Sequence, residues 1–188
     1  MEYGPATGGR VLRRRSFRVL AVLVLVLFGG TSVFALHDAL LRDDPDGWVA
    51  AALVLVSGSC CYRVTRCRVH LGENSVTVVN PLFSHELPYA SIRKIEVDPS
   101  GSLTVLPKET VADTQGDGYL VVGFAGSPLD RVFKTSDKAA VELRRHHKRR
   151  RRAPGADGPV RRRLVADAVA EAMLLSAAVC AACAVALG

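Results

Sequence analysis

Aromatic residues are scarce in this sequence. Its 188 residues include six Phe, four Tyr and one Trp, while Val, Leu and Ala supply most of an apolar fraction of 49%. The large core of a big catalytic domain needs more bulky side chains than these. The composition therefore favours lipid-facing helices and a small β core over a large enzyme fold.

Cysteines are few, and their spacing suggests neither disulfides nor a zinc site. The five present suggest no disulfide framework and offer zinc no four-ligand site. Cys180 and Cys183 have the spacing of a redox motif, but they lie within an Ala-rich run that favours a helix. We interpret them as small apolar side chains that fill space.

Catalytic motifs are missing as well. The sequence has no Gly-x-Ser-x-Gly, His-Glu-x-x-His or P-loop pattern. His85 and Glu86 are neighbours in an expected strand and face opposite ways, which makes them a poor acid–base pair. His146 and His147 point about 100° apart on a helix, so a solvated basic face is favoured over a metal or pH-sensing site. We expect no enzyme activity, no cofactor and no metal ion.

Positive charge is concentrated outside residues 69–137, the central part of the expected folded domain. The formal net charge is +7, but 18 of the 25 Lys and Arg residues fall in groups that flank apolar segments or the linker between them. Residues 69–137 instead hold five Lys or Arg against nine acidic residues. A nucleic-acid groove needs clustered cations on the domain surface, so this stretch argues against one.

Two apolar runs predict a transmembrane hairpin at residues 16–63, after a disordered basic tail at residues 1–15. Val19–Leu36 has 18 residues without a charge, and Trp48–Tyr62 is a shorter run with an aromatic residue at each end. The alternative for the first run is a secretory signal peptide. Against it, Phe34-Ala35-Leu36 is a poor cleavage site, and a second apolar run follows within a dozen residues.

The charges around the hairpin predict its orientation. The connection at residues 37–47 is acidic, whereas arginines precede the first run and follow the second. Positively charged flanks favour the cytoplasmic side, so both ends of the hairpin should face the cytoplasm.

From about residue 65 the apolar pattern changes to alternation, which predicts a β-domain over residues 64–150. Cys67, Val69 and Leu71 should share a buried face, as should Val76 and Val78 in the returning strand. Helical periodicity follows Thr135 or Ser136, either of which can cap a helix. Strands are expected at residues 66–71, 75–80, 84–88, 92–97, 103–106, 119–125 and around 132–133.

The C-terminal part is predicted to be a basic Pro/Gly linker at residues 151–163 and a third transmembrane helix at residues 164–188. Ala172–Leu187 is uncharged for 16 residues, although Ala is weakly apolar, so this run either spans the membrane or lies on it. Asp167 and Glu171 share one face of its first two turns. Such acids can mark function inside a span, but near a helix N-terminus beside Arg161–Arg163 we interpret them as interfacial charges.

Two segments carry a resemblance to a known family. Val69–Leu82 combines a strand, a Gly-Glu-Asn turn and Thr77-Val78-Val79-Asn80-Pro81, and His85–Val97 contains Pro88-Tyr89 followed by Ile92, Ile95 and Val97. Together they resemble the membrane-anchored pleckstrin-homology (PH) domains of bacteria, of the actinobacterial type, over about residues 64–150. Tyr89 stands where that family usually has Trp. The resemblance implies an α+β fold of about seven antiparallel strands, in a partly open barrel or sandwich capped by a C-terminal helix, and it carries over no catalytic residue.

These observations predict a non-enzymatic multi-pass protein of the plasma membrane, with its N-terminus and PH-like domain in the cytoplasm, that meets a protein or lipid partner there. The turn at residues 71–75 has no Lys or Arg, so phosphoinositide recognition is not implied. The alternative is a membrane-associated nucleic-acid-binding protein that uses residues 144–152 as a basic arm. The oligomeric state stays open. Anionic lipid headgroups are expected to contact Arg144, Arg145, Lys148, Arg149, Arg150, Arg151, Arg152, Arg161, Arg162 and Arg163.

Overall fold

The computed structural model describes residues 10–14, 16–42, 45–108, 118–125, 135–153 and 155–187. The chain forms two compact units. One, the β-domain, comprises Met1–Arg14 and Cys67–Val165, and the other, the helical unit, comprises Arg15–Arg66 and Ala166–Gly188. Each unit is therefore built from segments that are distant in the sequence.

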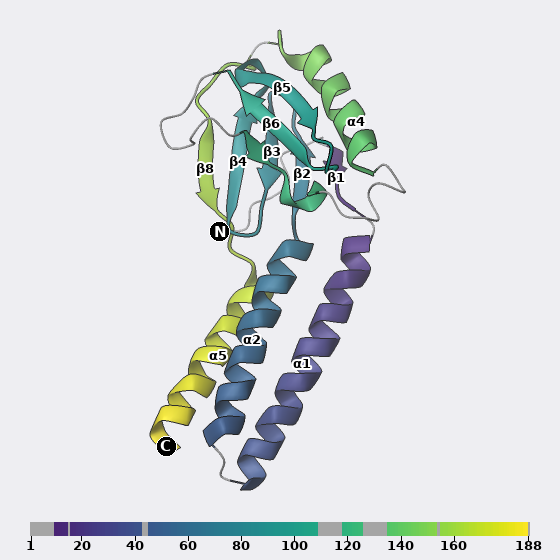
Figure 1. Cartoon of the computed structure of the whole chain (residues 1–188). Helices are drawn as coiled ribbons and strands as arrows, with labels where there is room; N and C mark the ends of the chain where they lie inside the picture. The colour runs from purple at the N-terminus through teal and green to yellow at the C-terminus, as the bar shows by residue number, and fades with distance from the viewer. Residues whose placement is uncertain are drawn as a thin grey trace. The chain divides into compact units, whose positions relative to one another are not determined.

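Three long helices make up the helical unit (Figure 1): α1 (Ser16–Arg42), α2 (Pro45–Thr65) and α5 (Ala168–Leu187). All three are long and apolar enough to cross a membrane. Most of the large apolar side chains of α1, including Val22, Val26 and Phe34, are exposed, as lipid-facing positions are. The predicted hairpin and third apolar helix are confirmed as helices.

The connection between α1 and α2 is shorter than the acidic loop expected at residues 37–47. Helix α1 continues to Arg42, and α2 already begins at Pro45. In the last turn of α1, the Nε of Arg42 lies 2.9 Å from Oδ1 of Asp38. Because this pair has the i, i+4 spacing that stabilises helices, charged residues at the end of an apolar run extend the helix rather than stop it.

Small residues on α2 let the three helices pack closely. A Cβ placed on Gly58 would lie 2.5 Å from Cε of Met173 on α5 and 2.7 Å from Cβ of Phe28 on α1. The neighbouring Ser59 is fully buried, and its hydroxyl donates to the carbonyl of Ala170 at 3.0 Å. Cys180 packs against this core with Ala51, Leu55 and Ala177, as expected of an apolar filler.

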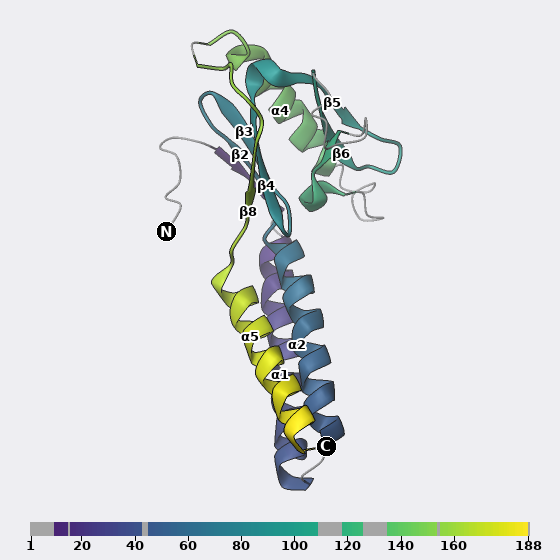
Figure 2. The ribbon, with the colours of Figure 1, turned by 90° about the vertical axis from the view of Figure 1, so that its left-hand side faces the viewer.

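The β-domain contains two antiparallel sheets and one long helix (Figures 1 and 2). Sheet A has the order β1-β2-β3-β4-β8, and sheet B the order β5-β6-β7. Helix α4 (Thr135–Arg150) packs against β5 and β6. The strands are β1 (Arg10–Leu12), β2 (Arg68–Leu71), β3 (Ser75–Val79), β4 (Phe83–Pro88), β5 (Ile92–Val97), β6 (Leu103–Pro107), β7 (Tyr119–Leu120) and β8 (Arg161–Leu164).

One apolar core lies between sheet A, sheet B and α4. Val76 and Val78 are fully buried, whereas Thr77 between them is partly exposed, so the predicted alternation in β3 is confirmed. Tyr89 is fully buried in this core, and its hydroxyl donates to the carbonyl of Gly72 at 3.1 Å. An aromatic ring with a polar tip therefore fills the position where the resemblance leads one to expect Trp.

Two strands of sheet A were not predicted. The segment expected to be a disordered tail contributes β1, and β8 begins within the segment expected to be a linker. Both are edge strands, and all four residues of β8 are exposed. Because their stability comes from backbone pairing with β2 and β4 rather than from buried side chains, they lack an alternating apolar pattern.

The strand expected at residues 119–125 is also shorter than predicted. Only Tyr119–Leu120 is strand, and a 3₁₀ turn follows at Val122–Phe124. Within that turn, a Cβ on Gly123 would lie 3.2 Å from Cβ of Cys67. The strand expected around residues 132–133 lies outside the described residues, as does most of the loop at 113–118.

The registers of sheet A place the chain connections at one end of the sheet. Leu12, the last residue of β1, pairs with Val69, next to the first residue of β2. A single row then crosses the sheet through Arg68, Val79, Ser84 and Arg163. We call this the connection end, because β1 leads from here to α1, β2 arrives from α2, and β8 leads to α5. The opposite end carries the turn at residues 72–74.

Candidate functional site

The ten cations predicted to contact lipid occupy two separate places in the β-domain. We call Arg144, Arg145, Lys148, Arg149, Arg150, Arg151 and Arg152 the α4 cation group, and Arg161, Arg162 and Arg163 the β8 cation group. The first lies on and just after α4, and the second forms most of the edge strand β8. The structure therefore does not assemble them into one site.

The α4 cation group lies at the end of the β-domain opposite to the connection end. The Nε of Arg144 donates to the carbonyl of Ile95 at 3.0 Å, and Nε2 of His147 lies 3.1 Å from the carbonyl oxygen of Tyr89. Tyr89 in turn bonds through its N–H to the carbonyl of Asn74, in the 72–74 turn. All seven cations of the group are exposed, so they form a basic surface toward this end.

His147 is not part of a wholly solvated basic face. Its ring is half-buried, and burial lowers its pKa below the ordinary value, with the carbonyl of Tyr89 acting in the other direction. His146 has Nε2 3.8 Å from Oε1 of Glu142. Glu142 lies one helical turn earlier, so the i, i+4 spacing in the sequence could have predicted this carboxylate partner. Arg10 of β1 also binds Glu142, at 2.6 Å.

The β8 cation group is divided between the two faces of sheet A. Arg161 and Arg163 pair with Glu86 and Ser84, while Arg162 pairs with His85 on the other face. The guanidinium carbon of Arg162 lies 3.6 Å from the centre of the Phe83 ring, a cation–π contact. The outer face of sheet A therefore carries Arg161 and Arg163 along one edge.

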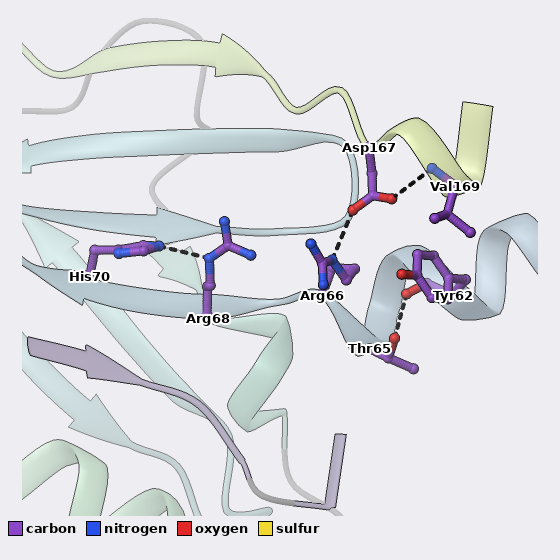
Figure 3. Close-up of polar contacts among 7 residues, drawn as sticks. All are labelled: Tyr62, Thr65, Arg66, Arg68, His70, Asp167 and Val169. Carbon is purple, nitrogen blue, oxygen red and sulfur yellow. Dashed lines mark hydrogen bonds and ion pairs between the residues drawn. The ribbon is translucent and has the colours of Figure 1, made fainter. Parts of the chain in front are cut away.

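Arg68 is a cation of this outer face that the predicted site omitted. Its Nε donates to Nε2 of His70 at 2.7 Å (Figure 3). Burial lowers the pKa of His70, and the charge of Arg68 adds to this effect, so the acceptor nitrogen stays unprotonated at neutral pH. Arg68 stands in the same cross-strand row as Arg163. The basic spacing 63–66–68 was visible in the sequence, but its pairing across the sheet was not.

His85 lies on the core side of sheet A. It pairs with Val78, whereas Glu86 pairs with Thr77, so the two residues face opposite ways as expected. The His85 ring lies 4.7 Å from that of Tyr119, and burial, followed by the charge of Arg162, lowers its pKa. Its Nδ1 is buried without a hydrogen-bond partner among the described residues. A neutral ring packed on an aromatic side chain suits a structural role.

Asp167 and Glu171 both bind arginines in or directly after the last turn of α2, within the helical unit. Oδ2 of Asp167 accepts from Nε of Arg66 at 2.8 Å, and Oδ1 accepts from the N–H of Val169 at 3.2 Å (Figure 3). Glu171 pairs with Arg63 at 2.5 Å. Asp167 is thus the N-cap of α5 as well as an ion-pair partner. The two acids, expected to be interfacial charges, are thus also ion-pair partners of Arg66 and Arg63.

A family model described as Bacterial PH domain matches residues 66–173, which is more than half of the chain. The chain belongs to the bacterial PH domain family. Its PH domain extends further than the 64–150 estimated from the sequence, because the match includes β8 and the first turns of α5. No curated protein and no solved structure is significantly similar to the chain.

The described residues contain no group of three or more His, Cys, Asp or Glu side chains that could hold a metal ion. Cys67 is buried in the β-domain, and burial raises its pKa to about 12, so its thiol stays protonated at neutral pH.

Proposed function

We propose that this bacterial PH domain protein is a non-enzymatic integral membrane protein that presents its β-domain, at the inner face of the membrane, to a protein or lipid partner. The observation that carries the proposal is the pairing of β1 with β2. These strands flank the α1–α2 pair in the sequence, yet they belong to one sheet. This pairing supports the placement of the residues before α1 and of the domain after α2 on the same side of the membrane.

The charge pattern supports a cytoplasmic location for that side. The flanks of the hairpin carry Arg10, Arg13, Arg14, Arg15 and Arg18 before it, and Arg63, Arg66 and Arg68 after it. Residues 37–47, between the two apolar runs, carry one arginine, Arg42, and it is paired with Asp38. Positively charged flanks stay in the cytoplasm, so α1 and α2 form a hairpin and α5 leads outward.

Cysteine labelling in intact cells tests this topology. The five native cysteines are replaced by Ala, and a single cysteine is placed at Asn74 in the β-domain or at Asp46 in the first turn of α2. A membrane-impermeant maleimide should label the Asp46→Cys variant from outside and the Asn74→Cys variant only after lysis. The opposite pattern would overturn the orientation.

A separate observation favours the nucleic-acid-binding alternative, because all seven cations of the α4 cation group are exposed. Filter binding of the detergent-solubilised protein to DNA, over a salt series, distinguishes the two functions. A steep loss of affinity with salt that disappears in an Arg149→Gln/Arg151→Gln variant would favour nucleic acid. Absence of binding at low salt would leave the protein or lipid partner.

A further inference from the structure

We propose that the connection end of the β-domain docks on the surface of the membrane that holds the helices, with three exposed leucines in the bilayer interface and Arg68 and Arg163 on anionic lipid phosphates. This inference rests on the proposed function, because it requires that the helical unit spans the membrane. The sequence predicts lipid contact at the α4 cation group, whereas this proposal assigns the lipid contact to the connection end, at the other end of the domain.

Three leucines stand exposed at the connection end. Leu164 is 79% exposed, Leu82 54% and Leu120 43%. The first two lie on adjoining chain segments, since Phe83 pairs with Leu164 and the N–H of Val165 donates to the carbonyl of Leu82 at 2.9 Å. Large apolar side chains grouped at one end of a domain indicate a surface that is covered in use.

Asn80 connects the third leucine to this end. Its side-chain amide donates to the carbonyl of Leu120 at 2.8 Å and accepts from the N–H of Val122 at 3.0 Å. These two bonds hold the end of β7 in sheet B against the turn that precedes β4 in sheet A. Leu82 lies in the same turn, so both sheets contribute an exposed leucine to the connection end.

The covalent connections identify the occupant of this surface. Arg68 follows Thr65, the last residue of α2, by three positions, and Leu164 precedes Asp167, the N-cap of α5, by three. Three residues reach about 10 Å at most. The leucines and the row from Arg68 to Arg163 are therefore held within a short distance of two helix ends that lie at the bilayer surface.

The charges of the same end complement an anionic bilayer. Arg68 and Arg163 occupy the two sides of one cross-strand row, with Ser84 and Val79 between them. Guanidinium groups bind phosphate well, and an apolar side chain flanked by arginines is suited to the interface. By contrast, the α4 cation group is directed to the opposite end, and Val141, 56% exposed, lies near the middle of α4, outside the strands of sheet A.

Tryptophan quenching by brominated lipid tests the docking in the full chain reconstituted in nanodiscs. In a Trp48→Phe background, a single Trp replaces Leu82, Leu164 or, as the matched control, Val141; all three positions are exposed, so folding should be retained. Lipid brominated near the headgroup should quench the Leu82→Trp and Leu164→Trp variants at least threefold more than the Val141→Trp variant. Equal quenching at the three positions would overturn the inference.

The charge component is tested in the same preparation. Arg68→Gln/Arg163→Gln should reduce the quenching of the Leu164→Trp variant in discs with 30% anionic lipid, whereas Arg149→Gln/Arg151→Gln should not. An equal effect of both pairs would contradict the assignment of the lipid contact to the connection end. Carbonate extraction of the wild-type chain separates the two proposals: a chain that is extracted refutes the proposed function, while an integrated chain without selective quenching refutes only the docking.

Discussion

Arg66 and Asp167 lie 101 residues apart in the sequence, yet Nε of Arg66 lies 2.8 Å from Oδ2 of Asp167. The bond ties the end of α2 to the start of α5, one turn from the parallel pair of Arg63 and Glu171. The sequence suggests these arginines as orientation signals and places these acids in the first turns of the last helix. In the structure they form two ion pairs between two apolar helices.

Asp167 should stabilise α5 in two separable ways. Asp167→Asn keeps an N-cap acceptor for the N–H of Val169 but removes the ion pair, while Asp167→Ala removes both. We expect Asp167→Ala to cost about 1 kcal/mol more than Asp167→Asn, since that is the usual contribution of an N-cap. Unfolding of the protein in mixed micelles, followed by circular dichroism, measures the difference. Equal losses would show that the cap contributes nothing.

Gly58 should tolerate no larger residue, whereas Gly30 should. A Cβ at Gly58 meets Met173 and Phe28, but one at Gly30 has no atom within 4 Å. Gly58→Ala should therefore destabilise the helical unit by about 1–3 kcal/mol through overpacking. Gly30→Ala should be neutral, or stabilising by up to about 1 kcal/mol, because Ala favours helices. The same micelle titration compares the variants, and a loss at Gly30 matching that at Gly58 would contradict this packing.

Val76→Asp should disrupt the β-domain far more than Thr77→Asp. Val76 is fully buried, and an unpaired charge there costs several kcal/mol, whereas Thr77 lies on the partly exposed face. Cys67 reports the damage, because its buried thiol should react with a maleimide only on unfolding. In a background with the other four cysteines replaced by Ala, alkylation should be fast in Val76→Asp and slow in Thr77→Asp. Similar rates would refute the strand register.

The β-domain should lose stability as the pH falls below about 6.5. Burial is the main cause that lowers the pKa of His70, His85 and His147 from the ordinary value of 6.5. The unfolded chain then binds more protons than the folded one. The free energy of unfolding therefore has its full value above pH 6.5 and decreases as the pH falls through the lowered pKa values. The rate of Cys67 alkylation between pH 7.5 and 5.5, corrected for the fraction of thiolate at each pH, measures the unfolding of the domain. His85→Gln should flatten the dependence, and an unchanged profile would contradict a role for His85.

The sequence alone determined the three apolar helices and the central strands. Val19–Leu36 carries no charge over a length that a bilayer requires, and no tertiary contact is needed to make such a segment helical. The alternation of apolar and polar residues likewise predicts a strand with Val76 and Val78 on its buried face, because side chains in a strand alternate with a period of two residues. Both signals are local and repeated, so they are present in the order of residues itself.

Only the tertiary structure decided which distant segments complete the sheet and where the cations lie. Strands β1 and β8 have three and four residues, with no buried alternation in β8, and their pairing with β2 and β4 depends on backbone bonds that leave no mark on side-chain pattern. The pairing of β8 with β4 puts Arg163 in one row with Arg68, while the contacts of α4 with Ile95 and Tyr89 put the α4 cation group at the other end. Runs of arginine look alike in the sequence. Which of them share a surface depends on which strands are neighbours in the folded sheet.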